Sequence, residues 1–168
     1  MEATNSTFDE LAVGDGIEVS RLVTARDVEL FAVVSGDHNP LHLDPEYAAT
    51  TQFGECIGHG MLIGAFVSAV IGLEFPGPGT VYLGQNLEFR SPIFLGDTLT
   101  IALAVESKHP KKPWLTLSLS VKNQEGKEVC RGESRVIAPT QKQTVKVIPP
   151  PAVELLDHDS PRLAAPVN

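Results

Sequence analysis

A loop rich in proton-handling side chains lies between positions 35 and 45. It has the sequence SGDHNPLHLDP, with two prolines and one glycine. Pro40 disfavours helix at the preceding residue, so we expect a structured loop between two helices. Asp37 and His42 are five residues apart, and a folded loop could bring their side chains together. A carboxylate beside an imidazole commonly activates water, because one group takes a proton while the other orients or relays one.

A second candidate is the tripeptide His59-Gly60-Met61, which begins a long apolar segment. The first amides of a helix have no internal hydrogen-bond partner, and the helix dipole adds partial positive charge there. A carbonyl bound at Gly60 would be polarised as in an oxyanion hole. Both patterns also have plainer interpretations, because Gly-Asp-x-Asn-Pro is often only a turn and His42 could be an ordinary core histidine.

Metal and thiol chemistry are weakly indicated. The residues that could form a metal site are His38, His42, Asp44 and His59. A proline interrupts the H-x3-H spacing, so helical ligand geometry is lost and we expect no metal. Cys56 and Cys130 have no CxxC spacing, which predicts two packed thiols rather than a disulfide, a zinc cluster or a nucleophile.

Helices are predicted on both sides of the loop and after it. Thr24–Asp27 is a capping box, and Gly36 would end the helix that it begins. Asp44 and Pro45 predict a short helix that runs to about residue 51. The segment Met61–Leu73 is apolar on nearly every side, which predicts a long helix buried all round.

The C-terminal half changes to alternation of period two. The alternating apolar residues are Val81, Leu83, Leu87 and Phe89, then Leu99, Ile101, Leu103 and Val105, then Leu115, Leu117, Leu119 and Val121, and a fourth strand is expected over 128–137. Consecutive alternating strands form an antiparallel sheet with one buried face. The sheet would curl around the long helix, giving an α+β domain. A second copy would cover its edges, so we expect a symmetric homodimer.

Residues 1–139 are predicted to form one domain, followed by a proline-rich tail or linker over 140–168. The 168-residue chain has a net charge of −8, which argues against binding to nucleic acid or to an anionic membrane. The apolar segment 61–73 is too short to span a bilayer. The first residues lack the apolar core of a signal peptide, so we expect a cytoplasmic protein.

Three stretches together resemble the (R)-specific enoyl-CoA hydratases of the MaoC-like dehydratase family. They are SGDHNPLHLDPEYA (Ser35–Ala48), IGHGML (Ile57–Leu62) and YLGQNLEFRSPIFLGDTL (Tyr82–Leu99). The first two are specific in combination, and the third is a weaker, structural similarity. The resemblance implies a hot-dog fold and the reversible syn addition of water to trans-2-enoyl-CoA, giving (R)-3-hydroxyacyl-CoA.

The resemblance also implies roles for individual residues. Asp37 and His42 would be the catalytic pair, and the Gly60 amide would bind the thioester carbonyl. Ser68 on the central helix would support the aspartate, and Asn39 would shape the loop. No cofactor is implied, because coenzyme A is part of the substrate.

Candidates for binding the substrate are less specific. The apolar residues that could line the acyl pocket, or could simply be core, are Phe53, Leu62, Phe66 and Leu83. A phosphate-bearing coenzyme on an acidic chain needs a local basic patch, because charges act over about 8–10 Å in salt. The basic candidates, which could also be an ordinary solvated turn, are Arg90, Lys108, Lys111 and Lys112.

Two other functions compete with hydration. Hot-dog domains also cleave acyl-CoA thioesters, and a non-catalytic acyl-CoA-binding module of a larger fusion is a third possibility. The presence of both Asp37 and His42 favours hydration. His38 departs from the expected pattern, and its ring could act on Asp37 electrostatically or simply face solvent.

Overall fold

The computed structural model describes residues 1–155. The helices are α1 (Ala25–Ser35), α2 (Pro40–Leu43), α3 (Pro45–Ala49) and α4 (Gly60–Leu73). The strands are β1 (Glu2–Thr4), β2 (Gly16–Leu22), β3 (Val81–Phe89), β4 (Thr98–Lys108), β5 (Trp114–Lys122), β6 (Glu128–Ile137) and β7 (Thr144–Lys146). Five strands form one antiparallel sheet in the order β2-β4-β5-β6-β3.

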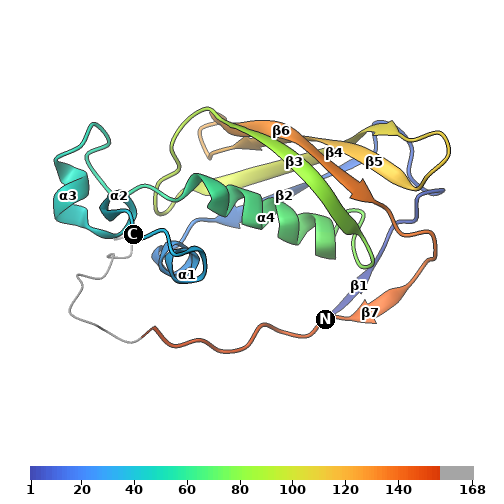
Figure 1. The fold of residues 1–168 in the computed structure, drawn as a ribbon, viewed down its shortest axis with the longest axis horizontal. Coiled ribbons are helices and arrows are strands. Elements are labelled where there is room, and N and C mark those ends of the chain that lie inside the picture. The colour runs from blue at the N-terminus through green and yellow to red at the C-terminus, as the bar shows by residue number, and fades with distance from the viewer. Residues whose placement is uncertain (156–168) are drawn as a thin grey trace.

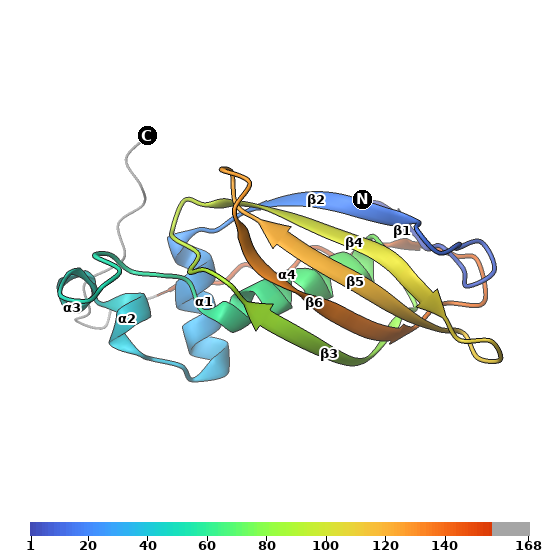
Figure 2. The ribbon, with the colours of Figure 1, turned by 90° about the horizontal axis from the view of Figure 1, so that it is seen from above.

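The sheet curves over one side of α4, which runs beneath its strands (Figures 1 and 2). Alternate residues of β4 and β5 are buried against the helix, as period-two alternation predicts. The buried residues of these two strands are Leu99, Ile101, Leu103, Val105, Leu115, Leu117, Leu119 and Val121. This α+β arrangement is the hot-dog fold, and the prediction from the sequence is confirmed.

Local signals position α1 as expected. The Thr24 hydroxyl oxygen accepts from the Asp27 amide at 3.1 Å, and the Asp27 carboxylate accepts from the Thr24 amide at 3.0 Å. Gly36 ends the helix with a φ of 75°, a conformation that a side chain would disfavour. The capping box therefore forms, and the chain turns sharply into the loop that contains Asp37.

The helix α4 differs from its prediction. Within one chain, only the side toward the sheet is buried, because a single sheet covers a single side of a helix. The buried residues are Leu62, Ile63, Gly64, Phe66, Val67, Val70 and Ile71. Met61, Ala65 and Ser68 are exposed on the other side, so the expectation of a helix buried all round is wrong for the single chain.

Part of the predicted tail is attached to the body. Strand β7 pairs with β1, with Glu2 opposite Lys146. The Asn5 side chain lies beside them, donating to the Gln141 carbonyl and accepting from the Gln143 amide. The rest of the predicted tail, 156–168, lies outside the described residues. No helix within 1–155 is long and apolar enough to cross a membrane.

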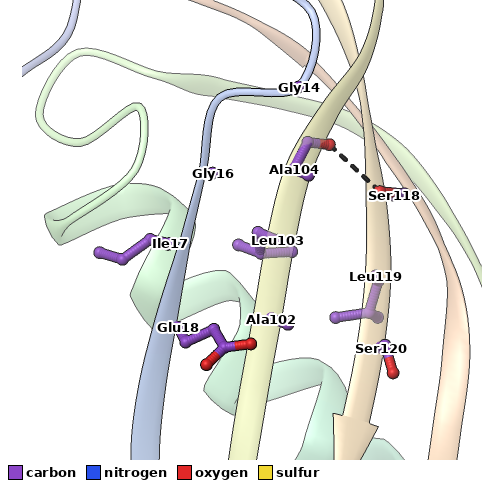
Figure 3. A pocket seen from close by; sticks show the side chains of 10 residues that line it. All are labelled: Gly14, Gly16, Ile17, Glu18, Ala102, Leu103, Ala104, Ser118, Leu119 and Ser120. Carbon is purple, nitrogen blue, oxygen red and sulfur yellow. Dashed lines mark hydrogen bonds between the residues drawn. The ribbon is translucent and has the colours of Figure 1, made fainter.

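The outer face of the sheet has a shallow hollow of about 450 Å³ between β2, β4 and β5 (Figure 3). Its floor is made of small side chains, and the Ser118 hydroxyl donates to the Ala104 carbonyl there. The hollow lies on the face of the sheet away from α4, so it is separate from the loop around Asp37. Cys56 and Cys130 are buried free thiols, as predicted, and burial raises the pKa of Cys130 to about 11.

Candidate active site

Short side chain to backbone hydrogen bonds build the loop between α1 and α2. The Ser35 hydroxyl donates to the Phe31 carbonyl and accepts from the Asp37 amide. The Asp37 carboxylate in turn accepts from the Asn39 amide at 3.2 Å. The Asn39 side chain then caps α2 by accepting from the Leu41 amide at 3.1 Å. These bonds place Asp37 directly before the helical turn that contains His42.

His42 is buried, with 8% of its surface exposed. Its Nδ1 lies 2.8 Å from the backbone carbonyl oxygen of Ile57. A carbonyl can only accept, so Nδ1 must be the protonated nitrogen of the neutral ring. The other nitrogen, Nε2, is then a bare acceptor, which can take a hydrogen bond or a proton from water.

Three titratable side chains converge at this point. One ligand-type atom from each of Asp37, His42 and His59 lies within 4.8 Å of the other two. A water that hydrogen-bonds at about 2.8 Å to each side can bridge such a gap. The same set, one carboxylate and two imidazoles, has the ligand types of a metal site. Neither His38 nor Asp44, which the sequence also suggested as ligands, belongs to it.

The N-terminus of α4 lies beside this cluster and differs from those of the other helices. Side chains cap α1, α2 and α3, whereas His59 makes no side-chain capping bond to α4. The first amides of α4 therefore lack a capping acceptor from His59. A Cβ at Gly60 would come within 3.3 Å of the Phe89 ring, so a larger residue there would crowd that ring.

A hollow of about 350 Å³ connects His42 with this helix terminus. Phe53, Gly60 and Arg90 line it, together with Phe89. Two of the predicted substrate residues, Phe53 and Arg90, thus lie where the prediction needs them. Their contact with substrate stays a prediction.

Other predicted substrate residues lie elsewhere. Leu62 and Phe66 belong to the core between α4 and the sheet, so they do not line the hollow beside His42. Their positions on α4 turn them toward the strands, which matches the core alternative that the sequence left open. Leu83 is 43% exposed on β3 and does not reach this hollow either.

In the single chain, the predicted lysines of the basic patch also lie far from the hollow beside His42. The three lysines lie at the end of β4 or in the turn 109–113 that joins it to β5, at the end of the sheet opposite to α2 and α3 (Figures 1 and 2). The Lys108 ammonium donates to the Phe8 and Leu11 carbonyls, and Lys112 lies over the Trp114 ring. Lys111 does not line the hollow beside His42 either. Among the predicted cations, Arg90 alone lines that hollow in the described chain.

A second hollow, of about 420 Å³, lies along the exposed side of α4. Ser68 lines it with Phe31 and Tyr82, and the Tyr82 hydroxyl is 2.7 Å from that of Ser134. In the described part of one chain, Ser68 makes no hydrogen bond to Asp37, so its supporting role stays a prediction. The sequence reasoning did not assign Phe31 or Tyr82, for which no local pattern gave a signal.

Comparisons with known proteins identify the family of this chain. The family model described as MaoC like domain matches residues 12–129. An (R)-specific enoyl-CoA hydratase of Rhodospirillum rubrum is 37% identical over 134 residues, covering 80% of this chain and 92% of that protein. An (R)-specific enoyl-CoA hydratase of Aeromonas caviae is 42% identical over 129 residues, covering 77% and 96%.

The structure of R-hydratase PhaJ1 from Pseudomonas aeruginosa in the unliganded form superimposes with a TM-score of 0.89. It is 46% identical and covers 92% of this chain and 99% of that one. The family match includes both the loop with Asp37 and His42 and the start of α4. From these matches we conclude that the chain belongs to the MaoC-like dehydratase family.

Proposed function

We propose that this protein is an (R)-specific enoyl-CoA hydratase. It adds water across the double bond of a trans-2-enoyl-CoA to give an (R)-3-hydroxyacyl-CoA, and it catalyses the reverse dehydration. The observation that supports this most directly is the approach of the Asp37 carboxylate and the His42 ring to within 4.8 Å, beside the uncapped start of α4. Proteins named (R)-specific enoyl-CoA hydratase or R-hydratase are 37–46% identical to this chain and cover 77–92% of it.

Asp37 and His42 hold the attacking water in this mechanism. Both groups are acceptors when His42 is neutral, so the water donates one hydrogen to the carboxylate and one to Nε2. Its free lone pair then points away from both groups and attacks Cβ. Asp37 takes a proton as the carbon–oxygen bond forms, and the same proton can return to Cα, leaving the enzyme unchanged. Delivery of both groups from one side accounts for syn addition.

The start of α4 stabilises the charge that develops on the substrate. As water attacks Cβ, the electron pair of the double bond moves toward the thioester carbonyl and forms an enolate. The Gly60 amide, helped by the helix dipole, donates to that oxygen. The chemistry requires no further group, since the coenzyme belongs to the substrate.

A single assay with crotonyl-CoA separates the competing functions. Hydration lowers the absorbance of the conjugated enoyl thioester without releasing free thiol. Thioester cleavage releases thiol, and a non-catalytic binding module changes neither signal. We expect loss of absorbance with no thiol. Release of thiol, or no change in either signal, would contradict the proposal.

We also propose that the protein acts as a homodimer. The two edges of the main sheet differ in balance. Strand β2 exposes Glu18 and Arg21 beside Leu22, whereas β3 exposes Val81, Leu83 and Phe89, at 53%, 43% and 46%, beside Glu88. Charges on an edge strand prevent pairing with another sheet, and apolar residues favour it. Asp37 is exposed in one chain, although hydration chemistry needs a site shielded from bulk water. A second copy bound along β3 would shield Asp37 from bulk water.

The dimer is tested by comparing the two edges. Leu83→Asp places a charge on the β3 edge, and Ser20→Asp places the same charge on the exposed β2 edge. We expect the Leu83 variant to halve its mass in light scattering and to lose most of its activity. The Ser20 variant should match the wild type in both. A wild type with the mass of one chain, or a Leu83 variant of unchanged mass, would contradict the dimer.

A further inference from the structure

His59 is the residue of the cluster to which no role has been assigned. It directly precedes α4, and only 2% of its surface is exposed. Its ring does not cap the helix, but turns back toward the loop between α1 and α2. There Nε2 lies 3.1 Å from the backbone carbonyl oxygen of Asp37, a residue 22 positions earlier in the chain. This bond joins the start of α4 directly to the backbone of the catalytic loop.

The His59 ring also lies between two other rings. Its centroid is 3.8 Å from that of His42, with the planes inclined by 31°, and 4.9 Å from that of Phe31. Contact at such distances restricts rotation of the His42 ring about its own side-chain bonds. His59 thus contacts both members of the predicted pair, the backbone of one and the ring of the other.

The hydrogen bonding of His59 shows which property of the side chain matters. The Asp37 carbonyl only accepts, so Nε2 is protonated and Nδ1 of the neutral ring is bare. Nδ1 is buried and has no hydrogen-bond partner among the described residues. A phenyl ring would fill the same space without leaving a buried acceptor unpaired. What histidine adds over an apolar ring is therefore the Nε2–H donor to Asp37.

We propose that His59 is a positioning residue. It holds the Asp37 carboxylate and the His42 ring at the separation at which one water molecule can hydrogen-bond to both. This inference rests on the proposed hydratase function. With 2% of its surface exposed and its ring packed against Phe31 and His42, His59 has almost no surface for substrate to contact. Its effect is exerted through the Asp37 backbone and the His42 ring.

Two amide substitutions test the donor directly. The amide nitrogen of His59→Gln occupies the region of Nε2 and can still donate to the Asp37 carbonyl. The amide nitrogen of His59→Asn occupies the region of Nδ1, where there is no partner. His59→Phe keeps the stacked ring and removes the donor, so it is the variant of choice if the asparagine variant does not fold.

We expect the glutamine variant to retain kcat within about threefold of the wild type, and the asparagine and phenylalanine variants to lose kcat on the order of 10–100-fold. KM for crotonyl-CoA should change less than twofold in all three. Equal activity of the glutamine and asparagine variants, or full activity of the phenylalanine variant, would overturn the proposal. Circular dichroism and melting temperature identify any variant that is merely unfolded.

A second measurement does not depend on activity. Carbon-13 NMR of the Asp37 backbone carbonyl reports whether that carbonyl accepts a hydrogen bond. We expect the same shift in the wild type and in His59→Gln, and a different shift in His59→Phe and His59→Asn, which lack the donor. An Asp37 carbonyl shift that is unchanged in His59→Phe would overturn the positioning role. If the wild type shows no hydratase activity but the spectra change as expected, the proposed function fails while the positioning role stands.

Discussion

Which nitrogen of each imidazole is protonated determines what the cluster can do. Both rings face a backbone carbonyl, His42 through Nδ1 and His59 through Nε2. The carbonyls select opposite tautomers, so His42 presents a bare Nε2 while His59 has a bare Nδ1 that is buried. Only the first of these nitrogens is available to water. Two adjacent histidines therefore have different roles because of their acceptors.

The substitution Asp37→Asn removes the proton acceptor and keeps the shape of the side chain. The amide oxygen can still accept from the Asn39 amide, so the loop should remain folded. We expect kcat for crotonyl-CoA hydration to fall about 10²–10⁴-fold, the usual contribution of a general base, with the melting temperature unchanged within experimental error. The exposed neighbour His38 supplies the matched control, and His38→Asn should leave kcat unaltered. Wild-type turnover by Asp37→Asn would remove Asp37 from the mechanism.

Contacts require glycine at the start of helix α4 but not at its end. Near the start, a Cβ at Gly60 would crowd the Phe89 ring. Near the end, Gly72 has open space where a Cβ would lie, so no contact requires glycine there. Glycine destabilises a helix by about 1 kcal/mol relative to alanine. Of these two glycines, a close contact therefore explains Gly60 and none explains Gly72.

These two glycines give a paired prediction for the helix. Gly72→Ala should raise the free energy of unfolding by about 0.5–1 kcal/mol without changing kcat/KM. Gly60→Ala should lower kcat/KM, because its methyl group stands against the Phe89 ring at the mouth of the hollow. Urea denaturation and steady-state kinetics on both variants check this. Equal kinetics for the two variants would show that the backbone at Gly60 is not part of the site.

For the whole molecule, burial of His59 links stability to pH. Desolvation, followed by the neighbouring His42, lowers the pKa of His59 from its ordinary value of 6.5. The unfolded chain then binds a proton at a higher pH than the folded chain does. The resulting stability is fully present above about pH 6.5, and is lost as the pH falls from there through the lower pKa of the folded state.

Acidification should therefore destabilise the wild type more than a variant that lacks this group. We expect the free energy of unfolding to fall between pH 7.5 and pH 5, and to fall less in His59→Gln. Urea denaturation at fixed protein concentration measures both slopes. The exposed His38→Gln serves as the reference and should keep the wild-type slope. If His59→Gln also keeps that slope, His59 is not the group responsible.

Sequence reasoning succeeded where the signal was local. The capping box at Thr24, the terminating Gly36 and the alternation along β4 and β5 each depend on residues a few positions apart. It missed β2, whose apolar alternation is limited to Ile17 and Val19, and it missed the pairing of β1 with β7. It singled out Asp37, His42 and Gly60 from their types and spacing, and it left open whether Leu62 and Phe66 line the pocket or belong to the core, which is where the structure places them.

The sequence alone determined α1, α3, α4 and the strands β3 to β6, because capping, turn geometry and the period of apolar residues act over a few residues. Only the tertiary structure decided how distant atoms meet: the Ile57 carbonyl on His42, the His59 ring on the Asp37 backbone, and the exposed side of α4. Backbone carbonyls are the same in every residue, so no side-chain pattern reveals which carbonyl a ring will face. Which carbonyl each ring faces depends on the packing of the whole chain, and it decides which nitrogen of that ring is protonated.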